Sequence, residues 1–145
     1  MPVMSAGSTL RAVDASAVDA LLEVAGPQCT APIAAVELRA LGGSLARPAA
    51  LPNAVGGRDA GWNLFVAAAP VPGLAPDIRR DHVRSVLRAA PPWRGPANLA
   101  NFIGRANEPN DLRASWSAEQ NARLDAVRRA ADPDGLFPFA AARPS

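Results

Sequence analysis

The segment Asn63-Leu-Phe-Val-Ala-Ala-Ala69 decides the fold, because it is short and nearly all apolar. A short apolar run of this kind is typical of a β-strand that is covered on both faces. A second strand is predicted over residues 33–41, where apolar residues alternate with a face that carries Glu37 and Arg39. The chain is therefore predicted to contain at least two strands of a β-sheet.

Three further segments have the apolar period of amphipathic helices. The first begins at Asp14 and ends before Gly26, and the second runs from Pro76 to Ala90. The third opens at Ser117, where Ser-Ala-Glu-Gln has the pattern of a capping box. One face of the first helix carries Val18, Leu21 and Leu22. The faces expected to be buried are formed by Val83, Val86, Leu87 and Ala90 in the second helix, and by Leu124, Val127 and Ala131 in the third.

These elements predict an α+β fold, with a small antiparallel sheet of two to four strands covered by about three helices. Residues 1–13 are expected to form a flexible N-terminus. Two strands alone make a marginal sheet, and an open apolar edge is a template for another chain. We therefore expect a homodimer, a complex with another protein, or a tendency to aggregate. If the chain stays monomeric, residues near 97–103 are expected to supply a third strand.

Composition narrows the classes of function. The chain has 145 residues, of which 49% are hydrophobic and 19% charged, and its formal net charge is only +2. This charge favours no nucleic-acid partner, and no apolar run is long enough to span a membrane. The first residues lack the pattern of a signal peptide, so a cytoplasmic location is expected. Cys29 and His82 are each the sole residue of their type, so neither a disulfide nor a metal site is expected.

Four stretches in order along the chain resemble the C-terminal part of the berberine-bridge-enzyme-like FAD-linked oxidoreductases. Each stretch alone is a weak signal, and their order and spacing carry the resemblance. They are Val36-Glu-Leu-Arg-Ala-Leu-Gly-Gly43, Arg58 with Asn63-Leu-Phe65, Asn98-Leu-Ala-Asn-Phe102, and Arg123-Leu124 with Asp132-Pro-Asp-Gly-Leu-Phe137.

The resemblance implies a cofactor and a place in a larger enzyme. Residues 14–145 are similar to part of the family's substrate domain, which lays its sheet over the flavin, and residues from about 95 to 145 are similar to its C-terminal segment. In the family a separate N-terminal domain holds most of the FAD, and nothing in this sequence is similar to that domain. Neither Cys29 nor His82 matches the residues to which the family attaches FAD covalently.

The resemblance also implies site residues. Asn101 would hydrogen-bond the polar edge of the flavin, or it is a loop Asn that bonds its own backbone. Glu37, Arg39, Trp62 and Leu99 would border the substrate pocket. For Glu37 and Arg39 the alternative is an ion pair on the sheet surface, and for Trp62 it is packing in the core.

No catalytic residue is predicted, because Leu99 and Phe102 stand where the family has tyrosines and neither can accept a proton. Past Phe137, the run Phe139-Ala-Ala-Ala142 replaces an Asn-Gln pair that the family places near the flavin.

The expected function is that of a C-terminal fragment or split subunit of an FAD-dependent oxidoreductase. It would oxidise a small organic substrate and would not be catalytic alone. The alternative is a non-enzymatic binding module or a degenerate remnant. The expected partners are a flavin-domain protein or a second copy of the chain, together with a small-molecule substrate.

Overall fold

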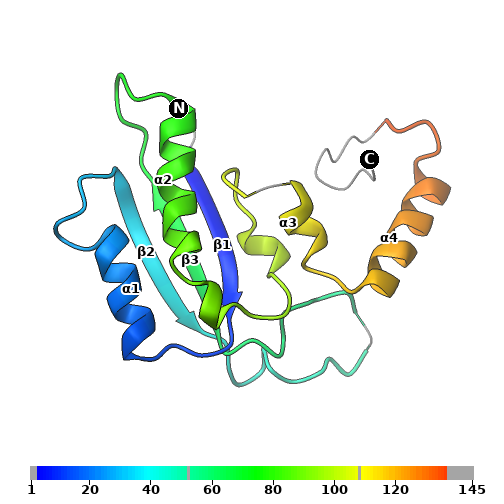
Figure 1. Ribbon diagram of the computed structural model, residues 1–145. Helices are drawn as coiled ribbons and strands as arrows, with labels where there is room; N and C mark the ends of the chain where they lie inside the picture. Colours follow the sequence, from blue (N-terminus) through cyan, green and yellow to red (C-terminus); the bar gives the residue numbers. More distant parts are fainter. Residues whose placement is uncertain (1–2, 52, 108, 137–145) are drawn as a thin grey trace.

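The computed structural model describes residues 3–51, 53–107 and 109–136. Within them the chain forms the strands β1 (Met4–Leu10), β2 (Ile33–Ala40) and β3 (Trp62–Ala68). The helices are α1 (Ala15–Ala25), α2 (Pro76–Arg88), the short α3 (Pro109–Arg113) and α4 (Ala118–Ala131), with two 3₁₀ turns, η1 (Pro91–Trp93) and η2 (Ala100–Phe102). The predicted α+β class with a small antiparallel sheet is confirmed (Figure 1).

The sheet has the order β1-β3-β2, with β3 in the centre and antiparallel to both neighbours. β1 and β2 are consequently parallel to each other, with β3 inserted between them. The order β-α-β-β-α with this insertion is that of a split β-α-β arrangement. The apolar run from residue 63 therefore forms the central strand, which explains why almost none of its residues is polar.

The expectation that residues 1–13 form a flexible N-terminus is wrong, because Met4–Leu10 is a strand in which all residues but Ser5 are buried. Its small polar residues gave no strand signal, and pairing with β3 supplies the order instead. Gly7 also has a packing role, because a Cβ there would lie 2.6 Å from the backbone oxygen of Phe102.

The outer edge of β1 is closed by the segment from Trp93 to Asn107. The backbone N–H of Arg11 donates to the carbonyl of Trp93, that of Gly95 to Thr9, and that of Ala106 to Ser5, each at 2.8 Å. Between them, the side-chain amide of Asn107 accepts from the N–H of Gly7 at 3.0 Å and donates to its carbonyl at 3.3 Å. A side chain here takes the place of a fourth strand. The third strand is therefore β1, and not the suggested segment near residues 97–103.

The core lies between the sheet and α2. Met4, Ala6 and Leu10 of β1 and Leu64 and Val66 of β3 pack against the helix. The predicted buried face of α2 is confirmed for Val83, Val86 and Ala90, and Leu87 is half-buried. Figure 1 shows α1 and α2 on the same side of the sheet, with α1 next to β2.

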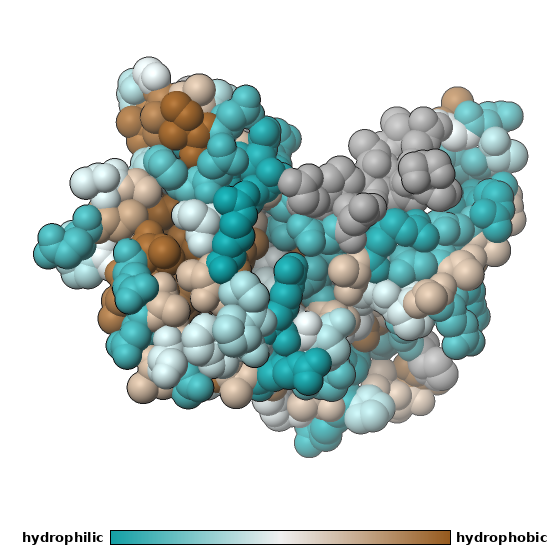
Figure 2. Space-filling model, in the orientation of Figure 1, coloured by the Kyte–Doolittle hydropathy of each residue, from teal (hydrophilic) through white to brown (hydrophobic). Residues whose placement is uncertain are grey.

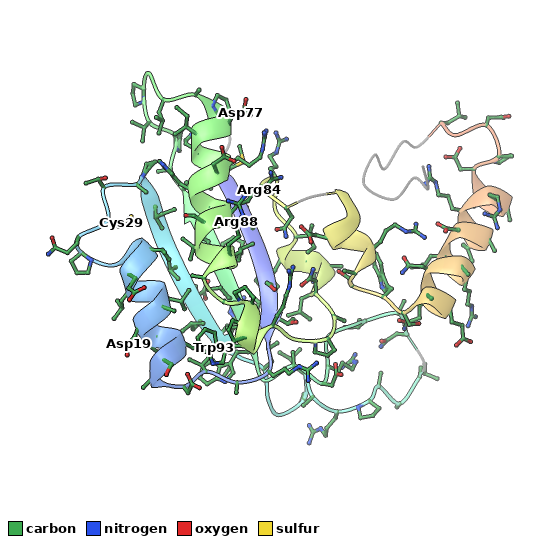
Figure 3. All side chains as sticks on the ribbon, viewed as in Figure 1. Asp19, Cys29, Asp77, Arg84, Arg88 and Trp93 are labelled. Atoms are coloured by element: carbon green, nitrogen blue, oxygen red, sulfur yellow. The ribbon has the colours of Figure 1, made fainter. Side chains whose placement is uncertain are left out.

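Two polar contacts tie α2 and α1 to the segment that closes β1. Arg84 of α2 donates from Nε to the carbonyl of Ala106 at 2.6 Å. Trp93 donates from its indole N–H to Asp14, which caps α1 by accepting from the N–H of Ala17. Figure 3 shows Arg84 on α2 and Trp93 below it. The hydrogen bonds that Asp14 accepts from Ala17 and Trp93 lower the pKa of its carboxyl group, and the bond from Ala17 has the larger effect.

The C-terminal helix departs from its prediction. The capping box of Ser117 and Gln120 is confirmed, but the expected burial of Leu124, Val127 and Ala131 is wrong. Val127 is 59% exposed, because α4 lies beside the sheet and not over it (Figure 1). Its attachment includes a two-pronged ion pair between Arg113 and Asp125, at 3.2 and 2.9 Å. Across the described ranges, no helix has the length and apolar character needed to cross a bilayer.

Candidate functional site

The candidate site lies on the sheet face that α1 and α2 leave uncovered. Side chains alternate along a strand, so Leu64 and Val66, which pack toward α2, leave Asn63 and Phe65 on the opposite face. The register sets Glu37 opposite Phe65 and Arg39 opposite Asn63. The charged residues of β2 therefore lie on the same face as Phe65.

The turn η2 brings Phe102 to this face. Its ring meets Phe65 edge-on, with the ring centroids 5.9 Å apart and an interplanar angle of 69°. The guanidinium carbon of Arg39 lies 4.7 Å from the centroid of the Phe102 ring, and Arg39 also forms an ion pair with Glu37. A cation over an aromatic face is stabilised by the ring quadrupole. Arg39 is therefore held against the face of Phe102.

A cavity of about 490 Å³ opens beside this stack. It lies between the end of β2, the long loop before β3 and the η2 segment. Its wall is mainly aliphatic and aromatic, with a few polar groups, as is usual for small-molecule sites. Its larger apolar lining residues are Leu41, Leu45, Val55, Leu99, Phe102 and Trp116, and its polar ones are Arg39, Arg58 and Asn101.

Arg58 organises the loop that forms one wall of the cavity. Its Nη1 donates to the carbonyls of Leu45 and Arg47, each at 3.0 Å, and its Nη2 donates to the side chain of Asn53 at 3.4 Å. Trp116 fixes the same loop by donating its indole N–H to the carbonyl of Ala54 at 2.6 Å. The loop is thus folded into a wall by polar contacts to its backbone.

Gly57 shows how closely this wall approaches its neighbours. Its φ is +71°, a value that side-chain-bearing residues rarely adopt, and a Cβ there would lie 3.0 Å from the side chain of Leu99. At the neighbouring Gly56 a Cβ would lie only 1.8 Å from the carbonyl oxygen of Ser115. The glycine pair therefore allows the loop, the η2 segment and the turn before α4 to meet.

The structure brings together three of the residues singled out in the sequence. Arg39, Leu99 and Asn101 all line the cavity, whereas Glu37 lies outside the lining and forms an ion pair with Arg39. Asn101 is exposed, and within the described part of the chain its side-chain amide has no hydrogen-bond partner.

Trp62 does not join this group. It lies on the helix-side face, where it is half-buried against the core, which agrees with the core-packing alternative. The run Phe139–Ala142, expected to lack a flavin contact, lies outside the described residues.

Other features of the site could not be predicted from the sequence. The stack of Arg39 on Phe102 joins residues far apart in the chain, and no local pattern indicates it. Asn63 is buried opposite Arg39, and neither atom of its side-chain amide has a hydrogen-bond partner within the described ranges. In the sequence, the only indication of a buried amide was that Asn63 is a polar residue in an otherwise apolar strand. Leaving it unpaired is costly to the fold.

The polar groups of the cavity are hydrogen-bond donors and one amide. Its lining includes two guanidinium groups and an amide, and among the described residues that form it there is no carboxylate, phenol, imidazole or thiol that could take a proton. No group of three His, Cys, Asp or Glu side chains that could hold a metal ion occurs in the part of the chain that the structure describes.

Comparison with models of known protein families finds no match to this chain, and neither does comparison with the sequences of curated proteins. The resemblance to the berberine-bridge-like oxidoreductases therefore depends on the four sequence stretches and on what their residues form together.

Proposed function

We propose that this chain is the substrate-domain portion of an FAD-linked oxidoreductase and that its cavity forms the substrate side of the active site. The observation that carries the proposal is the meeting of Arg39, Leu99 and Asn101 at one cavity on the uncovered sheet face. The sequence led us to expect Asn101 at the flavin edge and Arg39 and Leu99 at the substrate pocket, and their position at one cavity supports the proposal.

The surroundings of Asn101 support a role beside a flavin. Its amide is exposed and unpaired within the described residues, so both its donor and its acceptor are available to the polar edge of an isoalloxazine ring. Phe102 and Arg39 next to it form a surface of aromatic and guanidinium groups. The aliphatic wall opposite suits the apolar body of a small organic substrate.

The proposal assigns hydride acceptance to the flavin and gives this chain the task of positioning. Since the described residues that line the cavity include no proton acceptor, the proposal takes a base from a flavin-binding domain or from the substrate itself. FAD would be held mainly by that domain, in another chain or elsewhere in a longer polypeptide. The proposal includes oxygen as electron acceptor and a cytoplasmic location.

A fluorescence titration with FAD tests the proposal. The 145-residue chain should bind free FAD more weakly than about 1 µM, because it supplies only one side of the site. Asn101→Ala should weaken the residual quenching further, while Gln28→Ala, which removes an exposed amide outside the cavity lining, should leave it unchanged. Stoichiometric binding tighter than about 1 µM would mean a self-sufficient flavin site and would contradict the proposal. Quenching indifferent to Asn101→Ala would also contradict it.

A non-enzymatic binding module is the second candidate, and it is favoured because the described lining of the cavity includes no proton acceptor. Such a module would bind a small organic acid through Arg39 without any flavin. Thermal stabilisation by aromatic carboxylates that FAD neither enhances nor displaces would support this candidate over the first.

A further inference from the structure

The two edges of the sheet differ, and the outer edge of β2 is open. The N–H of Leu41 donates to the carbonyl of Gly61, so the register turns the backbone groups of odd-numbered β2 residues toward β3. The even-numbered Val36, Leu38 and Ala40 therefore direct their N–H and C=O groups outward. Within the described residues no strand pairs with them.

The helix side of this edge is apolar. Between α1 and β2 lies a hollow of about 450 Å³, lined by Val18 and Leu22 of α1 and by Val36 and Leu38 of β2, among others. Leu22 is 54% exposed, although it lies on the apolar face of α1. Figure 2 shows hydrophobic surface on the side of the molecule where α1 and β2 lie.

The other side of the edge carries one negative and one positive side chain, so it can pair with the same edge of a second copy. Glu37 and Arg39 project from the uncovered face, with side chains 46% and 42% exposed. In an antiparallel pair of β2 strands related by a two-fold axis, the sum of opposing residue numbers is constant. When the two numbers add up to 76, the two-fold axis passes Leu38, and Glu37 of each copy lies opposite Arg39 of the other.

We propose that two copies of this chain associate through β2 in this register, forming a continuous six-stranded sheet. The pairing supplies about six backbone hydrogen bonds from Val36, Leu38 and Ala40. It also places each Glu37 opposite an Arg39 of the other copy, and it brings the two apolar hollows together. An isologous contact of this kind closes on itself and leaves no further edge for a third copy.

The association has a consequence for the cavity. Arg39 belongs to the cavity wall, so the second copy contributes its own Glu37 beside that wall. The proposal does not rest on flavin chemistry, because its contacts involve only β2 and α1.

Sedimentation equilibrium of the full chain, from low micromolar concentration to about 1 mM, tests this proposal. The wild type should fit a monomer–dimer equilibrium. Glu37→Arg and Arg39→Glu should each raise the dissociation constant by roughly tenfold, because each replaces two attractive cross-strand pairs by repulsive ones. The double variant Glu37→Arg/Arg39→Glu restores the opposition of charges and should recover most of the affinity. Glu23→Arg changes the same charge on the exposed side of α1 and serves as the matched control.

Leu38→Pro provides a second variant that does not depend on charge. It removes an outward N–H and leaves the bonds to β3 intact, so the monomer should fold while the dimer is lost. Circular dichroism checks the fold of each variant. A wild type that stays monomeric at about 1 mM would overturn the proposal. A dimer insensitive to both the charge reversals and Leu38→Pro would do so as well.

Discussion

The two faces of the sheet are built from the same strands, but one is closely packed and the other is partly exposed. On the helix side, Leu64 and Val66 meet Val83 and Val86 of α2, and all are fully buried. On the other side, Arg39, Phe65 and Phe102 form a partly exposed stack next to a cavity. The difference teaches that alternate residues of the same strand can form a closely packed core on one face and leave the other face open beside a cavity.

The largest effect is expected from truncation on the helix side. Leu64→Ala should lower the free energy of unfolding by about 2–5 kcal/mol, because it leaves a cavity in a closely packed core. Leu99→Ala, at the wall of a cavity that is already open, should lower it by less than about 1 kcal/mol. Urea denaturation measures both values. Equal losses would abolish the distinction between the faces.

A smaller effect is expected where β1 supports the stack. Gly7→Ala introduces a Cβ 2.6 Å from the backbone oxygen of Phe102, so the η2 segment must shift. Overpacking of this kind typically lowers stability by about 1–3 kcal/mol. Gly42→Ala is the matched control, because its Cβ would meet nothing within 4 Å. If thermal melts show the two variants to be equally stable, Phe102 is not held against the sheet as described.

The interaction of Arg39 with Phe102 should contribute a still smaller free energy to stability. A double-mutant cycle of Arg39→Ala and Phe102→Ala should give a coupling free energy of about 0.5–1 kcal/mol, the usual value for an exposed cation over a ring. The parallel cycle of Arg39→Ala with Phe65→Ala should give less, because the cation lies over the Phe102 ring. A coupling of zero in the first cycle would mean that the stack adds nothing to stability.

The ion pair between Arg113 of α3 and Asp125 of α4 lies on neither face of the sheet, and it should weaken at low pH. The hydrogen bond from Arg113 lowers the pKa of Asp125 below its ordinary value of 3.8. A carboxyl whose folded pKa is depressed contributes stability that is complete above the unfolded pKa and is lost as the pH falls through the folded one. The α4 amides should therefore lose hydrogen-exchange protection below about pH 4, while those of β3 keep it. Asp125→Asn should remove this pH dependence, and a variant that retains it would show that another group holds the helix.

The fold was predictable where one local pattern dominated. The apolar run at residues 63–69 and the stripe of Val83 and Val86 identified β3 and α2, because burial on both faces or on one stripe leaves a plain periodicity. β1 was not predicted, since Ser5, Gly7 and Ser8 have little strand propensity and owe their order to pairing with β3. The burial expected for Val127 was wrong, because amphipathic periodicity shows a face but not whether another element covers it.

The site was predictable only in part, for a related reason. Arg39, Leu99 and Asn101 were identified through resemblance, and the structure gathers them at one cavity. Trp62 was grouped with them, yet its neighbour Asn63 is the residue that shares the face of Arg39, since strand residues alternate. The roles of Trp116 and Arg58 in shaping the wall depend on contacts across the chain that periodicity does not encode.

Hydrogen–deuterium exchange of the chain with and without millimolar FAD tests the central claim most directly. If the uncovered face binds the flavin, protection should rise in the η2 segment and near Arg39, while α2 on the helix side should exchange unchanged. Asn101→Ala should remove the rise. Protection that appears on α2, or no change at the η2 segment at any FAD concentration, would contradict the assignment of the cavity to the substrate side of a flavin site.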